Sequence, residues 1–144
     1  MLKATIEAAL LEDERNIKDA IFEQQTLEGG HLTAFEFSNV TFRQCVFTAC
    51  DFTKAGFYGC TFEGCSLAGC KLIDSYFRDA AMTECKADGA NFTDAVFKQC
   101  TLRNCSFRYA NCSQTGWEGC TLEHCGFREA FFSEAKLKKL KLAE

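Results

Sequence analysis

The sequence contains no proline, one tryptophan and two methionines among its 144 residues. Proline lacks the backbone N–H that a strand ladder needs, so its absence favours a chain that is hydrogen-bonded along its whole length. No apolar run approaches the length that spans a bilayer, so we expect no membrane partner. The sequence also lacks a Cys-x-x-Cys pair, a phosphate-binding glycine loop and a nucleophile motif. These absences predict a protein that is not an enzyme and needs no cofactor.

Charge gives a similar exclusion. The net charge is −4, and no strongly basic stretch interrupts the body of the chain, so we expect no direct binding to nucleic acid. Acidic residues gather between Asp74 and Asp94, but lysines and arginines lie among them. We interpret this segment as a solvated surface of mixed charge.

The eleven cysteines first suggest disulfides or zinc. The count is odd, no signal peptide is evident, and His31 and His124 are far apart in the sequence. Zinc ligands cluster at short spacings, and only His124 and Cys125 are adjacent, so we expect no metal site. Free thiols persist in reducing compartments, which predicts a cytoplasmic protein.

What the sequence has instead is a period of five residues. From Phe22 to Leu142 every fifth residue is apolar, and 13 of these 25 positions are Phe and 8 are Leu. A period of five fits neither an α-helix nor a single strand, so it indicates a structural repeat. From Cys45 to Ala130 a small side chain lies two residues before each central position, and ten of the eleven cysteines occupy that column.

Typical repeat units are Cys45-Val46-Phe47-Thr48-Ala49 and Ala90-Asn91-Phe92-Thr93-Asp94. This pattern resembles that of the pentapeptide-repeat family, with Cys often in place of Ala and Thr or Ser in place of Asp or Asn. The resemblance covers residues 15–144. It implies an all-β fold, a right-handed quadrilateral β-helix with one pentad on each side, in which the small and the large apolar residues point inward.

Residues 20 apart support four pentads per coil without reference to the family. Thr41, Thr61, Thr101 and Thr121 share one such column, and stacked threonines are able to hydrogen-bond along it. Residues 15–144 then give about 6.5 coils and a rod roughly 30 Å long at about 4.8 Å per coil. The predicted core is Phe37, Phe42, Phe47, Phe52, Phe57, Phe62, Phe77, Phe92, Phe97, Phe107, Trp117 and Phe127, with the column Cys45, Cys65, Cys85, Cys105 and Cys125.

Two places interrupt the regular pattern of large central residues. Met82 and Ala87 are consecutive weak positions, and Cys112 is followed by the wide Trp117. Such breaks mark either a groove or complementary packing of small and large side chains, and we favour packing.

Residues 1–14 do not fit the repeat. They are rich in helix formers, and Leu2, Ile6, Ala9 and Leu10 share one helical face. We predict a short N-terminal helical cap over the first coil, because solenoids need covered ends. The alternative is a helix that binds a partner or a second copy.

The last 10–14 residues are ambiguous between a final coil, a C-terminal cap and a short helix with Leu137 and Leu140 on one side. An apolar end with edge strands needs covering. The resemblance to quinolone-resistance members of the family implies a homodimer through this end. The four lysines there are an alternative means of protecting the edge.

Three functions fit these observations. The first is a non-catalytic protein-binding scaffold whose protein partner the sequence does not identify. The second, implied by the resemblance, is a DNA mimic that binds DNA gyrase or topoisomerase IV and modulates it or protects it from quinolone-type poisons. A DNA mimic needs a strongly negative surface, whereas one outward column reads Glu23, Arg43, Glu63, Thr83, Arg103 and Glu123. The third is a structural spacer or immunity-type partner.

Few aromatic residues fall outside the predicted core. Tyr58 and Tyr76 lie on one face in adjacent coils, and large buried aromatics dominate protein interfaces. The candidate interface residues are therefore Tyr58, Tyr76, Phe131, Leu137 and Leu140.

Overall fold

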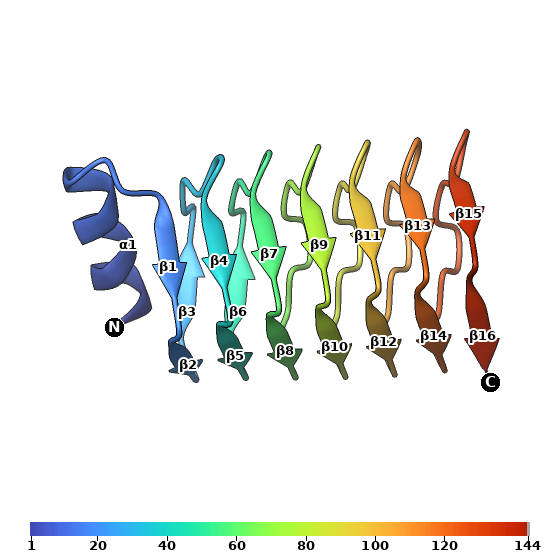
Figure 1. The fold of residues 1–144 in the computed structure, drawn as a ribbon, viewed down its shortest axis with the longest axis horizontal. Coiled ribbons are helices and arrows are strands. Elements are labelled where there is room, and N and C mark those ends of the chain that lie inside the picture. Colours follow the sequence, from blue (N-terminus) through green and yellow to red (C-terminus); the bar gives the residue numbers. More distant parts are fainter. Residues whose placement is uncertain (144) are drawn as a thin grey trace.

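The computed structural model describes residues 1–143; Glu144, the last residue of the expected β-helix, lies outside this range. The chain forms a right-handed parallel β-solenoid of about six turns, preceded by one α-helix (Figure 1). Four walls run along the rod. Each wall receives one pentad from every coil, as the period of five and the period of 20 predict.

Two walls are continuous parallel sheets of seven strands each. The first wall contains β1 (Asn16–Lys18), β4 (Glu36–Ser38), β7 (Gly56–Tyr58), β9 (Tyr76–Arg78), β11 (Val96–Lys98), β13 (Gly116–Glu118) and β15 (Lys136–Lys138). The second wall contains β2 (Ile21–Glu23), β5 (Thr41–Arg43), β8 (Thr61–Glu63), β10 (Ala81–Thr83), β12 (Thr101–Arg103), β14 (Thr121–Glu123) and β16 (Lys141–Ala143).

The other two walls have less regular pairing. The third wall starts with β3 (Thr26–Glu28) and β6 (Val46–Thr48) and continues through single bridges from Val46 to Gly126. The fourth wall consists only of such bridges, from His31–Asp51 to Asn111–Phe131. Every paired residue lies 20 positions from its partner, so the register has no slip in the described chain.

The corners between walls have an unusual backbone. Every fifth residue from Asp19 to Lys139 has a φ between 50° and 69°, and only six of these 25 corners are glycine. A left-handed conformation costs a non-glycine residue on the order of 1 kcal/mol. The corner N–H compensates by donating to the next coil, as in Asp19 N to Ser38 O at 3.0 Å.

Stacked aromatic rings fill the axis. On the first wall the ring centroids of Phe37, Phe57 and Phe77 are 5.1 and 4.8 Å apart, and Phe97 lies 4.0 Å from Trp117. Met82, Ala87 and Cys112 are fully buried, so the weak central positions are packed into this core.

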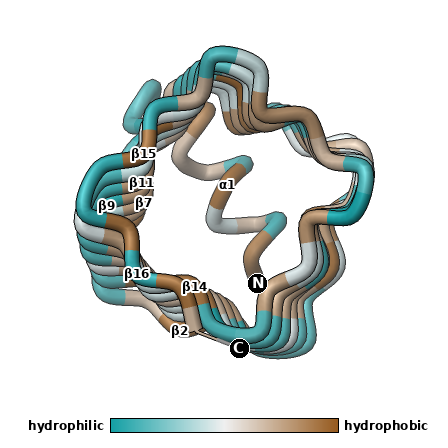
Figure 2. Tube along the Cα trace, turned by 90° about the vertical axis from the view of Figure 1, so that its right-hand side faces the viewer, coloured by the Kyte–Doolittle hydropathy of each residue, from teal (hydrophilic) through white to brown (hydrophobic). Residues whose placement is uncertain are grey.

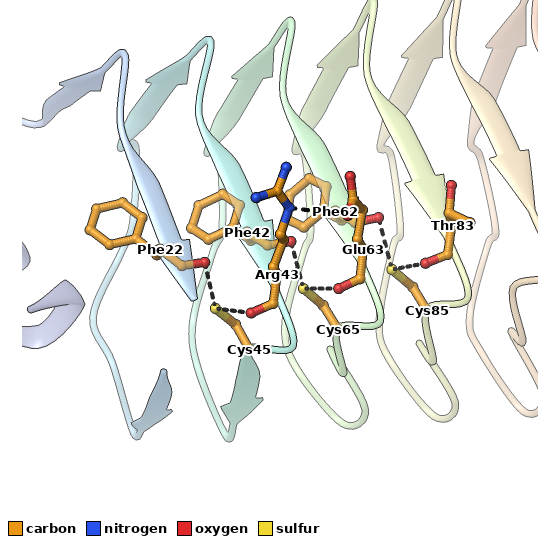
Figure 3. Close-up of polar contacts among 9 residues, drawn as sticks. All are labelled: Phe22, Phe42, Arg43, Cys45, Phe62, Glu63, Cys65, Thr83 and Cys85. Carbon is orange, nitrogen blue, oxygen red and sulfur yellow. Dashed lines mark hydrogen bonds and ion pairs between the residues drawn. The ribbon is translucent and has the colours of Figure 1, made fainter. Parts of the chain in front are cut away.

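The cysteine column links successive coils. Cys45 Sγ donates to Phe22 O at 3.4 Å, Cys65 Sγ to Phe42 O at 3.2 Å and Cys85 Sγ to Phe62 O at 3.4 Å (Figure 3). A thiol is thus small enough for the inner column and also satisfies a carbonyl of the preceding coil. All eleven cysteines are free.

The two ends of the rod differ. Helix α1 (Leu2–Leu11) lies across the N-terminal end, where Leu2 and Ile6 are buried (Figure 2). The C-terminal end is a final coil with β15 and β16, not a helix. Within residues 1–143 no further coil packs on it, and two predicted core residues of this coil, Cys125 and Phe127, are only half-buried. Both side chains nevertheless pack against the core.

The cap can be tested by substitution. We expect Ile6→Ala to lower the free energy of unfolding by about 2–4 kcal/mol, because it leaves a cavity between α1 and the first coil. Glu7→Ala, on the exposed face of the same helix, is the control and should change it by less than about 0.5 kcal/mol. The measurement is guanidinium unfolding at 25 °C. Equal stabilities of the two variants would contradict a capping role.

Candidate interaction surfaces

Two ion pairs interrupt the charged column of the second wall. Because residues 20 apart stack, Arg43 Nε lies 3.2 Å from Glu63 Oε2 and Arg103 Nε lies 3.1 Å from Glu123 Oε2. These pairs are exposed, so each adds little stability. Their consequence is electrostatic: this wall offers no continuous negative surface.

The fourth wall presents short polar side chains. The Thr53 hydroxyl donates to Asp51 Oδ1 at 2.5 Å, and Thr93 makes the same contact with Asn91. The pKa of Asp51 is lowered by the hydroxyl and the N–H of Thr53. On this wall the threonines bond locally, because the carboxylate or carboxamide two residues earlier is within reach of the hydroxyl.

The two candidate tyrosines meet on the first wall. The ring centroids of Tyr58 and Tyr76 are 5.7 Å apart, and both side chains are half-buried. Burial, with a smaller contribution from Glu36, raises the pKa of Tyr58. The Tyr58 ring lies over the backbone of Gly56 in the same strand, because a Cβ at Gly56 would be 2.7 Å from Tyr58 Cε2. The Tyr58 ring therefore packs within the protein, which leaves less of this pair free to contact a partner.

The other candidates gather at the C-terminal coil, far along the rod from the tyrosines. Phe131 and Leu137 are 61% and 59% exposed, and Leu140 is partly buried against the core. Sequence reasoning placed Phe132 and Leu142 in the interior column, yet they are 37% and 71% exposed. Their position in the last coil was the available signal, since an inward residue stays exposed when no coil follows.

The interior thiols are arranged for packing. His124 lies on an exposed corner while Cys125 Sγ points inward to Leu102 O at 3.4 Å, so this pair does not converge. Within residues 1–143 no three His, Cys, Asp or Glu side chains are placed to hold a metal ion. Burial alone raises the pKa of the Cys112 thiol to about 12 and also raises that of Cys60.

The family follows from these observations and from direct comparison. The family described as "Pentapeptide repeat region" matches residues 55–132, and "Pentapeptide repeats (9 copies)" matches residues 17–71. This chain belongs to the pentapeptide repeat family. No curated protein sequence matches the chain significantly. Among residues 1–143, no helix is long and apolar enough to cross a membrane.

Solved structures share the fold at low sequence identity. A pentapeptide repeat protein from the thylakoid lumen of Arabidopsis thaliana matches with a TM-score of 0.63 and 18% identity, over 67% of each chain. A trypsin-treated variant of QnrB1, a plasmid-mediated fluoroquinolone resistance protein, matches with a TM-score of 0.51 and 17% identity. That match covers 88% of this chain and 89% of the QnrB1 chain.

The buried Cys112 thiol makes a contribution to stability that falls in alkali. Between pH 9 and 12 the unfolded chain releases the Cys112 proton while the folded protein keeps it, so folding loses about 1.4 kcal/mol per pH unit for this thiol. We expect Cys112→Val, a change of similar volume, to reduce the slope of unfolding free energy against pH by that amount. Urea unfolding at several pH values measures the slope. Identical slopes would contradict the assignment.

Proposed function

We propose that this protein is a non-catalytic, protein-binding rod and that two copies join through their C-terminal ends. The observation that supports this proposal is the apolar C-terminal end. Trp117, Leu122 and five residues of the last coil line an apolar hollow of about 200 Å³ there, and Leu137 and Leu142 are more than half exposed. Exposed apolar surface of this kind marks an interface.

The backbone at this end points to the same conclusion. Among the strands of residues 1–143, β15 pairs only with β13 and β16 only with β14, so one edge of each remains open. An unpaired edge is a template for another chain. The N-terminal coil, by contrast, is covered by α1 (Figure 1). The N-terminal end therefore offers no equivalent open surface for a second copy.

A second copy is the occupant that suits such a surface best. Two identical ends related by a two-fold axis close on themselves, whereas a head-to-tail contact would continue into a filament. Lys136, Lys138, Lys139 and Lys141 are exposed and flank the apolar residues in the sequence. Lysine stems are able to pack along apolar surface while their ammonium groups stay in water, so these residues form a solvated rim.

Binding to a type II topoisomerase is the second candidate. It rests on the likeness to QnrB1, which is a likeness of fold. The internal ion pairs Arg43–Glu63 and Arg103–Glu123 weigh against it, because a DNA mimic needs a long field of one sign. We therefore place the scaffold first, with its other protein partners undefined. Eleven free thiols fit a reducing compartment, and we propose the cytoplasm.

The dimer is tested by charge insertion at the apolar end. Leu137→Glu should fold normally, because the side chain is exposed in one copy, but should give a monomer, because an unpaired carboxylate is costly to bury in the interface. Leu11→Glu is the matched control, since Leu11 is 89% exposed at the opposite end. Sedimentation velocity should show twice the 16.1 kDa chain mass for the wild type and for L11E. A monomeric wild type would refute this dimer.

The topoisomerase alternative is tested by a gyrase supercoiling assay, with and without a quinolone-type poison. We expect no inhibition and no protection at tens of micromolar protein, because the second wall lacks a continuous negative surface. Inhibition at sub-micromolar protein would put the second candidate first. Arg43→Glu together with Arg103→Glu is an informative variant, because it makes the second wall acidic and should increase any effect.

A further inference from the structure

A groove lies on the first wall over Gly116. It has a volume of about 750 Å³ and opens between the corner residues Asp94, Gln114 and Glu134 and the strand residues Val96, Gly116 and Lys136. It is separate from the apolar C-terminal end, although both include residues of the last coil. Its size falls within the range of small-molecule and side-chain pockets.

Neither conformation nor packing requires a glycine at this position. The φ of Gly116 lies outside the left-handed region, so any residue can adopt its conformation. A Cβ at Gly116 would meet only Val96 Cγ2, at 3.9 Å, which is ordinary contact. Glycine weakens a strand because it adds no side-chain packing and loses more entropy on folding. The bare backbone therefore leaves open space that another residue would fill at no cost to the fold.

The same column contains a glycine whose space is filled. Gly56, Tyr76, Val96 and Gly116 succeed one another along the first wall. At Gly56 the phenol ring of Tyr58 lies on the backbone, because a Cβ there would be 2.7 Å from Cε2 and 2.8 Å from Oη. On this wall, therefore, an aromatic ring packs on strand backbone that a glycine leaves without a side chain.

At Gly116 the equivalent side chain is turned elsewhere. The residue two positions on is Glu118, and its Oε1 lies 3.8 Å from Lys138 Nζ. The peptide groups of the floor are already used, since Gly116 N donates to Ala95 O at 2.9 Å and Lys136 N donates to Thr115 O at 2.8 Å. The floor therefore offers a flat surface with no unpaired ladder N–H, which suits a ring and not a polar group.

The rim of the groove carries two carboxylates, which determine the charge that a ligand should have. Asp94 and Glu134 are exposed on the corner side of the groove, and Gln114 Nε2 donates to Glu134 Oε2 at 3.1 Å. Two carboxylates on one side favour a cation there. We propose that the groove receives an aromatic side chain of a partner protein, with a neighbouring Lys or Arg of that partner beside Asp94 and Glu134. The inference rests on the proposed protein-binding function and adds the chemistry of the partner.

The test uses the full ¹⁵N-labelled chain and the peptide acetyl-Arg-Tyr-Arg-amide. We expect saturable shifts of the amide resonances of Gly116, Val96 and Gln114 during titration. Acetyl-Arg-Ala-Arg-amide should bind about tenfold or more weakly, because it lacks the ring to bury. Acetyl-Glu-Tyr-Glu-amide should also bind more weakly, because it places acids beside acids.

Two variants make the test specific to the groove. Gly116→Val fills the space with the residue found at position 96 and should abolish the shifts while leaving the thermal unfolding temperature equal or higher. Gly126→Val, on the third wall with no atom within 4 Å of its Cβ position, is the control and should bind like the wild type.

Three results would overturn the inference: no shift at Gly116, equal binding by G116V, or equal binding of the tyrosine and alanine peptides. None of these bears on the C-terminal dimer, which sedimentation measures separately. Failure of the groove is therefore distinguishable from failure of the proposed function.

Discussion

Vertical stacking of identical chemistry at a spacing of 20 residues is the constraint on which the structure depends. Each coil's backbone N–H and C=O groups pair with the coils above and below, as in Thr41 N to Ala20 O at 2.9 Å and Thr61 N to Val40 O at 3.0 Å. Because the register never slips, every side chain lies above the residue at the same position of the repeat in the preceding coil. Rings therefore stack on rings, thiols form columns, and arginines meet glutamates.

This constraint also explains why the functional surfaces are local exceptions. A wall that repeats one residue type is uniform, so recognition needs places where the repeat changes. Gly116 interrupts a column that carries Tyr76 and Val96, and the last coil interrupts the stacking altogether. The ion pairs of the second wall arise from the same stacking and remove the negative field that a DNA mimic needs.

The architecture could be predicted from the sequence, because the period of five corresponds to one wall and the period of 20 to one coil. Burial of the last coil could not be read from the period, because Phe127 and Phe132 obey the repeat, yet within residues 1–143 no further coil packs on them. The groove was also invisible, because whether Gly116 is covered depends on the direction that Glu118 takes. The sequence placed Tyr58 and Tyr76 on one face, but it did not predict that Tyr58 packs on the backbone of Gly56.

Helix α1 closes one end of the rod, and that end is made first during translation. Each coil contacts only its neighbours, so a nascent chain can wind its second coil onto a finished, covered first coil before the rest has been synthesised. During synthesis the rod then has one uncovered end, which is the end nearest the ribosome. Because the covered end forms first, the apolar C-terminal surface is completed only after the preceding coils have been made.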